Sequence, residues 1–396
     1  MNFTFGELRT TLLIFCASAI LHAQTFPSGS TGADGDLIVN TAGVTTFTAT
    51  PAGGGNVYNF KTIQIAAGAT LKLSGSVFPG PLYFLAQGAV TVAGTIDLSG
   101  QNGIVPATSG QRTGATIPGP GGYGGGAASF GANAALPGLG PLGGAATTLN
   151  CFGHILGSPG GTSATQFLVP LVGGSGGGGN IGNGGAGGGA LLIASSVSIT
   201  VTGTITAAGG SGIQTNGGNG SGAGAGGGIR LVAPSIAGNG TITAAGGVAG
   251  YSVSSCNNTG ANGIVRLESF TFTFTGTTGG NVYTASPVNL FLPAANTQPL
   301  ITVVSIGGIN VPANPTGTFT VPDVLLNSTS PLTVSIHATN IPPGTIPTLY
   351  FATQNFPDQT IVAPALAGTL AASTATATVT LNPGYSIGLV TATWVQ

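Results

Sequence analysis

Apolar and polar residues alternate in several short segments of the chain. Residues 229–232 read Ile-Arg-Leu-Val, and residues 265–268 read Val-Arg-Leu-Glu. A period of two predicts β-strands that bury one face. The alternate positions, Arg230, Arg266 and Glu268, then point outward. The side chains expected to point inward are Ile229, Leu231, Val265 and Leu267.

The strand pattern is part of an internal repeat. Residues 187–210 recur as residues 226–247, with the front halves 39 residues apart, and a third copy runs from 262 to 276. Earlier relatives lie at 80–103 and 60–76. Strands with one apolar face bury it fully only when the copies stack. The repeat therefore predicts a parallel β-solenoid with coils of roughly 20 residues.

Glycine-rich spacers separate the strand segments. Glycine fills 12 of the 17 positions in 173–189 and 8 of the 12 in 217–228. We expect loops along one edge of the solenoid, either stacked tightly on one another or mobile, because glycine allows close backbone approach but costs chain entropy to order. In the longest spacer, about 100–189, we expect at most a short strand at 167–171.

Beyond residue 299 the glycine tracts stop and strands bounded by proline begin. Their spacing predicts an antiparallel β-sandwich like immunoglobulin or fibronectin type III domains, without the two cysteines of an antibody domain. The candidate strands are 301–306, 316–321, 332–338, 348–353, 375–381 and 388–395.

The first 23 residues have the pattern of a secretory signal peptide. Arg9 precedes an apolar run of ten residues, 12–21, and we expect cleavage after Ala23. The run is too short to span a bilayer, and we expect no membrane span in the mature chain. The expected organisation is a signal peptide at 1–23, an N-terminal cap with the first strands at 24–60, the glycine-rich solenoid at 61–280, a linker at 281–298 and the sandwich at 299–396.

Charged residues make up only 3% of the chain. A nucleic-acid binder needs several cationic side chains on one face, so nucleic acid is not an expected partner. Cys151 and Cys256 both lie in the exported part of the chain, where a disulfide is the default expectation and two separate thiols are the alternative.

The repeated register, with segments such as IRLVAPSIAGNGTITAAGG, resembles the glycine-rich right-handed parallel β-helix proteins that environmental bacteria export. The resemblance covers about residues 60–276 and implies the superfold of pectate lyases and polygalacturonases. Those enzymes display clusters of acidic and basic side chains on one face, whereas this solenoid carries few. We therefore assign no catalytic residue and no cofactor, and an enzymatic role is the less favoured alternative.

Three groups of residues are candidates for binding. Arg230, Arg266 and Glu268 form either an anion or uronate subsite or an exposed ladder of offset charges. Asp34 and Asp36 could supply oxygen ligands to calcium, although the spacing lacks the later acid of a full calcium loop, and a simple turn is the alternative. No other metal site is expected.

The leading functional hypothesis is a secreted or cell-surface structural or adhesion-type protein, a solenoid scaffold that carries an interaction-prone sandwich. The alternative is a β-helix that binds or cleaves carbohydrate, and polysaccharide or other surface components are the expected partners in either case. That alternative predicts a groove lined by aromatic and ionisable side chains. The sequence leaves the oligomeric state open. The candidates for the groove are Tyr58, Tyr83, Phe84, Tyr123, Phe152 and Tyr251.

Overall fold

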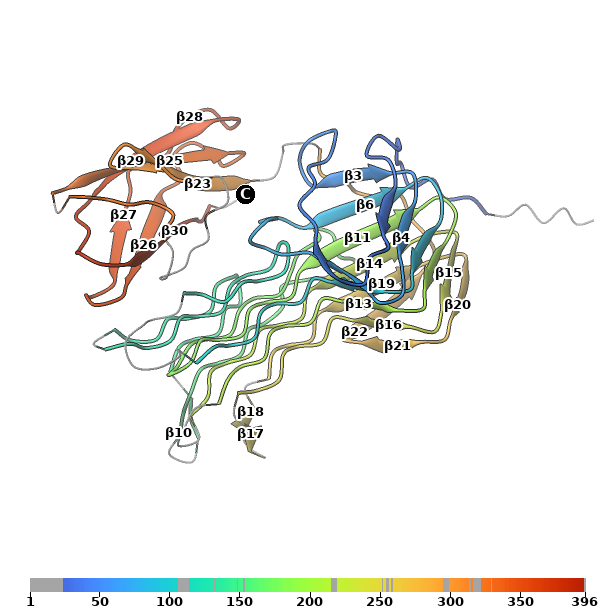
Figure 1. Ribbon diagram of the computed structural model, residues 1–396, viewed down its shortest axis with the longest axis horizontal. Coiled ribbons are helices and arrows are strands. Elements are labelled where there is room, and N and C mark those ends of the chain that lie inside the picture. The colour runs from blue at the N-terminus through green and yellow to red at the C-terminus, as the bar shows by residue number, and fades with distance from the viewer. Residues whose placement is uncertain are drawn as a thin grey trace, which may run out of the picture.

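The computed structural model describes residues 24–105, 114–131, 133–147, 149–151, 154–214, 219–250, 252–253, 256–257, 259–294, 299–312, 315, 322–328 and 330–394. These residues form strands connected by extended segments and turns, and none of their elements is a helix that could cross a bilayer. The all-β fold class is confirmed. A parallel solenoid is followed by an antiparallel sandwich, and an extended region lies beside the coils (Figure 1).

The solenoid consists of three parallel sheets, and each complete coil contributes one strand to each sheet. Sheet A contains β1 (Leu37–Val39), β4 (Ile63–Ile65), β7 (Val90–Val92), β12 (Ile199–Val201), β15 (Ser235–Gly238) and β20 (Thr271–Phe274). Sheet B contains β2 (Gly43–Thr46), β5 (Ala69–Lys72), β8 (Thr95–Asp97), β13 (Thr204–Thr206), β16 (Thr241–Thr243) and β21 (Thr277–Gly279). Sheet C contains β3 (Val57–Phe60), β6 (Leu82–Ala86), β11 (Ala190–Ser195), β14 (Gly228–Val232), β19 (Ile264–Glu268) and β22 (Asn281–Ala285).

The interior of the coils is a column of stacked aliphatic side chains. Ile96, Ile205 and Ile242 are register partners on successive strands of sheet B, and each is fully buried. The same register aligns Leu191 with Ile229 in sheet C. The predicted inward positions are therefore confirmed, and the stack turns three short strands per coil into one continuous core.

Aromatic rings close the N-terminal end of this column. Phe47 packs against Tyr58, Phe78 and Phe84 with ring centroids 5.2, 5.7 and 5.5 Å apart. Large rings there bury the apolar edge of the column.

The glycine tracts form a packed bundle of extended segments beside the coils (Figure 1). We call this region the glycine bundle; its segments are 98–104, 117–127, 136–145, 157–161, 173–189, 207–213, 220–227, 244–248 and 260–263. Successive N–H groups of residues 174–179 donate to segments 182–188, 157–161 and 136–144 in turn, and then to the same three again. The hydrogen-bond partners thus repeat every three residues, and no hydrogen bond joins two residues within 174–179. Both features are typical of polyproline II geometry. The backbones therefore bond laterally to several neighbours at once, as β-strands do not.

Only glycine fits at many positions of the bundle. A Cβ atom on Gly187 would lie 1.8 Å from the carbonyl oxygen of Gly174, and one on Gly185 would lie 2.0 Å from that of Gly210. Of the two alternatives left open by the sequence, the structure shows tight stacking. The expected strand at 167–171 is wrong, because this stretch forms a turn in which Leu168 has a positive φ.

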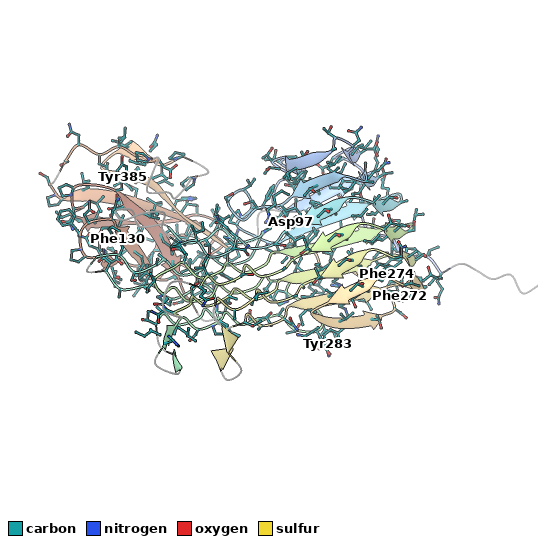
Figure 2. The ribbon with its side chains drawn as sticks, turned by 60° about the horizontal axis from the view of Figure 1, so that its bottom comes forward. Asp97, Phe130, Phe272, Phe274, Tyr283 and Tyr385 are labelled. Atoms are coloured by element: carbon teal, nitrogen blue, oxygen red, sulfur yellow. The ribbon has the colours of Figure 1, made fainter. Side chains whose placement is uncertain are left out.

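Two short hairpins project from the same side of the bundle (Figures 1 and 2). One pairs β9 (Leu149–Cys151) with β10 (His154–Leu156), and the other pairs β17 (Ser252–Val253) with β18 (Cys256–Asn257). Each hairpin contains one of the two cysteines expected to form a disulfide. Their side chains lie outside the described part of the structure, so the disulfide stays a prediction.

The C-terminal region folds as two antiparallel sheets. The first orders β24 (Ile309–Asn310), β23 (Leu300–Ile306), β25 (Leu332–Thr339), β29 (Ser373–Val379) and β28 (Ala367–Gly368). The second orders β27 (Gln359–Val362), β26 (Pro347–Thr353) and β30 (Ser386–Ala392). Five of the six predicted strands correspond to β23, β25, β26, β29 and β30, while 316–321 falls outside the described residues.

The sandwich does not cover the last coil of the solenoid (Figure 1). The side chain of Asn133, in the bundle region, donates to the carbonyl oxygens of Thr353 and Phe356 and accepts from the N–H of Asp358. The sandwich therefore contacts the bundle region, and Figure 1 shows it away from β20, β21 and β22. The chain reaches this position because the segment with Leu290 and Leu292 packs on the outer face of sheet C.

Candidate functional site

Two arginines and one glutamate gather on the outer face of sheet C. Strands β14 and β19 pair in parallel, which sets Arg230 directly beside Arg266. Glu268 lies two residues beyond Arg266 and therefore points to the same face. The sequence correctly placed all three side chains on one outward face of adjacent coils.

A single carboxylate oxygen joins the cluster. The Nε atoms of Arg230 and Arg266 donate to Oε1 of Glu268 at 2.8 and 2.6 Å. Arg230 is 2% exposed, Arg266 is 9% exposed and Glu268 is fully buried. The expectation of an exposed ladder is therefore wrong. The outward face of sheet C is covered, which alternation within the strands cannot reveal.

A second apolar core covers this outer face. It includes Leu85, Leu192 and Val232 from the strands, together with Leu168 and Leu171 from the turn after the long spacer. The linker contributes Leu290 and Leu292, which pack against the cluster, and the N–H of Val288, which donates to Oε2 of Glu268 at 3.3 Å. Burial raises the pKa of Tyr83 in this core to about 12, although the nearby charge of Arg230 acts to lower it.

The arginines line an open and mostly apolar cavity of about 410 Å³ at the surface. We call it the arginine cavity; its lining consists of Phe167, Val169, Arg230, Arg266, Val288, Asn289 and Phe291. The guanidinium carbon of Arg266 lies 5.5 Å from the centre of the Phe167 ring, within cation–π range. A cationic group inside apolar walls is suited to holding an anion.

The last coil leaves part of the solenoid core uncovered. Phe272 is the register partner of the buried Ile236, and Val282 that of the buried Val265, yet they are 45% and 38% exposed. Figure 2 shows Phe272, Phe274 and Tyr283 at this end of the solenoid. In the described chain, no strand pairs with the outer edges of β20, β21 or β22.

A row of threonines runs along the outside of sheet B. Its members are register partners on five successive strands and are partly or fully exposed. They are Thr70, Thr95, Thr204, Thr241 and Thr277. The row has the regular spacing of a parallel sheet, about 4.8 Å between neighbours.

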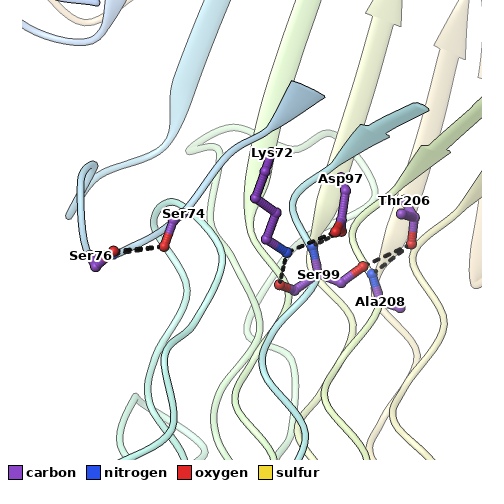
Figure 3. A network of polar contacts seen from close by, with 7 residues as sticks. All are labelled: Lys72, Ser74, Ser76, Asp97, Ser99, Thr206 and Ala208. Carbon is purple, nitrogen blue, oxygen red and sulfur yellow. Dashed lines mark hydrogen bonds and ion pairs between the residues drawn. The ribbon is translucent and has the colours of Figure 1, made fainter. Parts of the chain in front are cut away.

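A neighbouring row on sheet B carries an ion pair instead of continuous threonine. Lys72 Nζ lies 2.8 Å from Asp97 Oδ2 and also donates to the carbonyl oxygen of Ser99 (Figure 3). The Ser99 hydroxyl lies 3.0 Å from that of Thr206. Both charged side chains are roughly a quarter exposed, so the pair contributes at most about 1 kcal/mol.

The first coil holds the two calcium candidates in a hydrogen-bonded turn. Both carboxylate oxygens of Asp34 accept backbone N–H groups, from Ala52 at 2.6 Å and Asn59 at 2.5 Å. Asp36 accepts from the hydroxyl of Thr62 at 2.7 Å. The described residues contain no group of three or more metal-ligating side chains.

The aromatic candidates for a carbohydrate groove are not gathered in one cleft. Tyr58 and Phe84 lie in the solenoid core, whereas Tyr83 lies in the outer core of sheet C. Tyr123 is in the glycine bundle, where it packs near Gly140. Phe152 and Tyr251 are outside the described residues.

Sequence reasoning found the arginines but missed the groups that surround them. Phe167, Val288 and Phe291 come from segments distant in sequence. The apolar run at 290–292 was an available signal that this segment packs on the solenoid, as Leu290 and Leu292 do, although Phe291 is 80% exposed. In comparisons with known proteins, no family model, curated protein or solved structure matched this chain.

Proposed function

We propose that this is an exported structural protein, a stiff scaffold that assembles through its open last coil and carries the C-terminal sandwich as an interaction domain. The observation that supports the proposal best is the uncovered core at Phe272 and Val282. Exposed core side chains and unpaired strand edges are favourable for association with another chain. The aromatic cap closes the other end, so the favoured contact joins the last coils of two copies around a twofold axis.

Export is the second part of the proposal, supported by the signal-peptide pattern at 1–23 and by the resemblance to exported glycine-rich right-handed β-helices. Residues 1–23 lie outside the described chain. N-terminal sequencing of the protein recovered from the culture medium or cell surface tests this part, with residue 24 expected as the first residue.

The assembly is tested by light scattering on the purified full chain as its concentration is raised. We expect a dimer for the native protein and a monomer for Phe272→Asp, because a carboxylate there would be buried by the partner. Val197→Asp is the matched control; Val197 is 54% exposed on an internal coil, and this variant should still dimerise. A monomeric native protein, or equal dimerisation of Phe272→Asp, would contradict the proposal.

The threonine row on sheet B favours carbohydrate binding as a second candidate function. Its evenly spaced hydroxyl and methyl groups form a flat surface for a polymer with a matching repeat. Co-sedimentation with insoluble polysaccharides tests this, using Thr204→Lys as the variant and Thr302→Lys in the sandwich as the control. Equal retention of both variants would count against the row as a binding surface.

A further inference from the structure

We propose that the arginine cavity binds a small carboxylate ligand whose body is apolar and about the size of one ring. This site lies on the outer face of sheet C, where Arg266 is the register partner of Tyr283 in the last coil, and it is separate from the threonine row on sheet B. Its ligand would meet a cationic group at the base and apolar side chains at the walls.

The charges of the cluster do not balance. Two guanidinium groups share the single carboxylate of Glu268, which leaves one net positive charge on side chains that are at most 11% exposed. An uncompensated charge in such a place costs free energy, so its retention favours an anion as a further partner. One net charge matches a monoanion better than a dianion such as phosphate.

The geometry leaves hydrogen-bond donors free for that anion. Arg266 uses Nε for Glu268 and Nη1 for the carbonyl oxygen of Gln166. Arg230 uses only Nε, and no described residue accepts a hydrogen bond from its two terminal nitrogens. Arg230 lines the cavity, and its planar guanidinium can donate two parallel hydrogen bonds to one carboxylate.

The walls indicate the rest of the ligand. Phe167, Val169, Val288 and Phe291 are 55, 44, 52 and 80% exposed around the cavity. A ligand lying between them would cover these side chains without supplying many polar groups. The apolar walls favour a flat or ring-shaped hydrocarbon body over a sugar acid, whose hydroxyl groups would need partners.

The proposal is tested by titrating the full chain with benzoate and with benzamide, followed by calorimetry or ligand-observed magnetic resonance. We expect benzoate to bind at least tenfold more tightly, because the two probes differ chiefly in charge. Equal binding, or no binding of either probe at millimolar concentration, would overturn the proposal. Galacturonate and inorganic phosphate are expected to bind more weakly than benzoate. If galacturonate bound more tightly than benzoate, the assignment of an apolar ligand body would be overturned. If phosphate bound more tightly than benzoate, the assignment of a monoanion would be overturned.

Variants locate the binding. Arg230→Gln should remove the preference for benzoate, and it should lower the melting temperature less than Glu268→Gln does, since Arg266 and Glu268 still form a neutral pair. Lys61→Gln, which removes one exposed positive charge elsewhere, should bind as the native protein does. Phe291→Ala removes an exposed ring, so it should leave folding intact, and it should weaken the binding of benzoate several-fold. An unchanged benzoate preference in Arg230→Gln, or unchanged affinity in Phe291→Ala, would refute the site.

Discussion

The coils and the glycine bundle are two halves of the same repeat, stabilised in opposite ways. In the coils, short strands align aliphatic side chains such as Ile205 into a dry column. In the bundle, segments such as 174–179 bring backbone against backbone and bond to three neighbours in turn. Side chains would prevent that approach. The difference shows that one chain can form a continuous interior from aliphatic side chains in one place and mainly from peptide groups in another.

The two halves should differ in how much stability a small change of side-chain volume costs. Gly187→Ala places a Cβ atom 1.8 Å from the carbonyl oxygen of Gly174. Because that neighbour is backbone and cannot move aside alone, we expect a loss of at least about 4 kcal/mol in the free energy of unfolding. Denaturant unfolding followed by circular dichroism measures it.

The matched control is Gly53→Ala. A Cβ atom there meets nothing within 4 Å, so the change should stay within about 0.5 kcal/mol. Similar unfolding curves for the two variants would mean that the bundle is not tightly packed.

The second largest loss of stability is expected when the buried charge cluster on the outer face of sheet C loses its carboxylate. Glu268→Gln leaves the guanidinium groups of Arg230 and Arg266 side by side without a carboxylate. We expect a loss of about 3–5 kcal/mol in the free energy of unfolding, as for other buried ion pairs that lose one partner. A loss below about 1 kcal/mol, the value of an exposed pair, would show that the cluster is solvated.

The smallest effect is expected when volume is removed from the coil interior. Ile205→Val deletes one methylene group from a fully buried side chain, so the free energy of unfolding should fall by about 0.5–1.5 kcal/mol. Thermal unfolding of the two variants side by side gives the comparison. If Ile205→Val proved more damaging than Gly187→Ala, the stated contrast between the halves would be reversed.

The coils were largely predictable from the sequence, because alternation and repeat register follow from the geometry of a strand. Ile229 and Val265 therefore point inward as expected. The bundle was less predictable. Glycine at 174–179 carries no side-chain pattern, and its conformation depends on neighbours that are distant in sequence.

The candidate site was predictable only in part for the same reason. Strand register placed Arg230 beside Arg266, but their burial depends on the linker around Leu290 and on the turn at Leu168. No local pattern in β14 or β19 records that these segments cover the outer face. The cavity and the unused donors of Arg230 therefore emerged only from the tertiary structure.

Backbone hydrogen exchange in residues 174–189 tests the central claim most directly. The N–H groups of residues 174–179 and 183–189 donate to carbonyl oxygens across the bundle at 2.8 to 3.1 Å, and most of these residues are buried. We predict that their amides exchange as slowly as those of the coil strands β11 and β14, in which case the bundle unfolds together with the coils. Exchange at the rate of an unprotected chain, with β11 and β14 still protected, would show that the glycine tracts are loops and contradict the account.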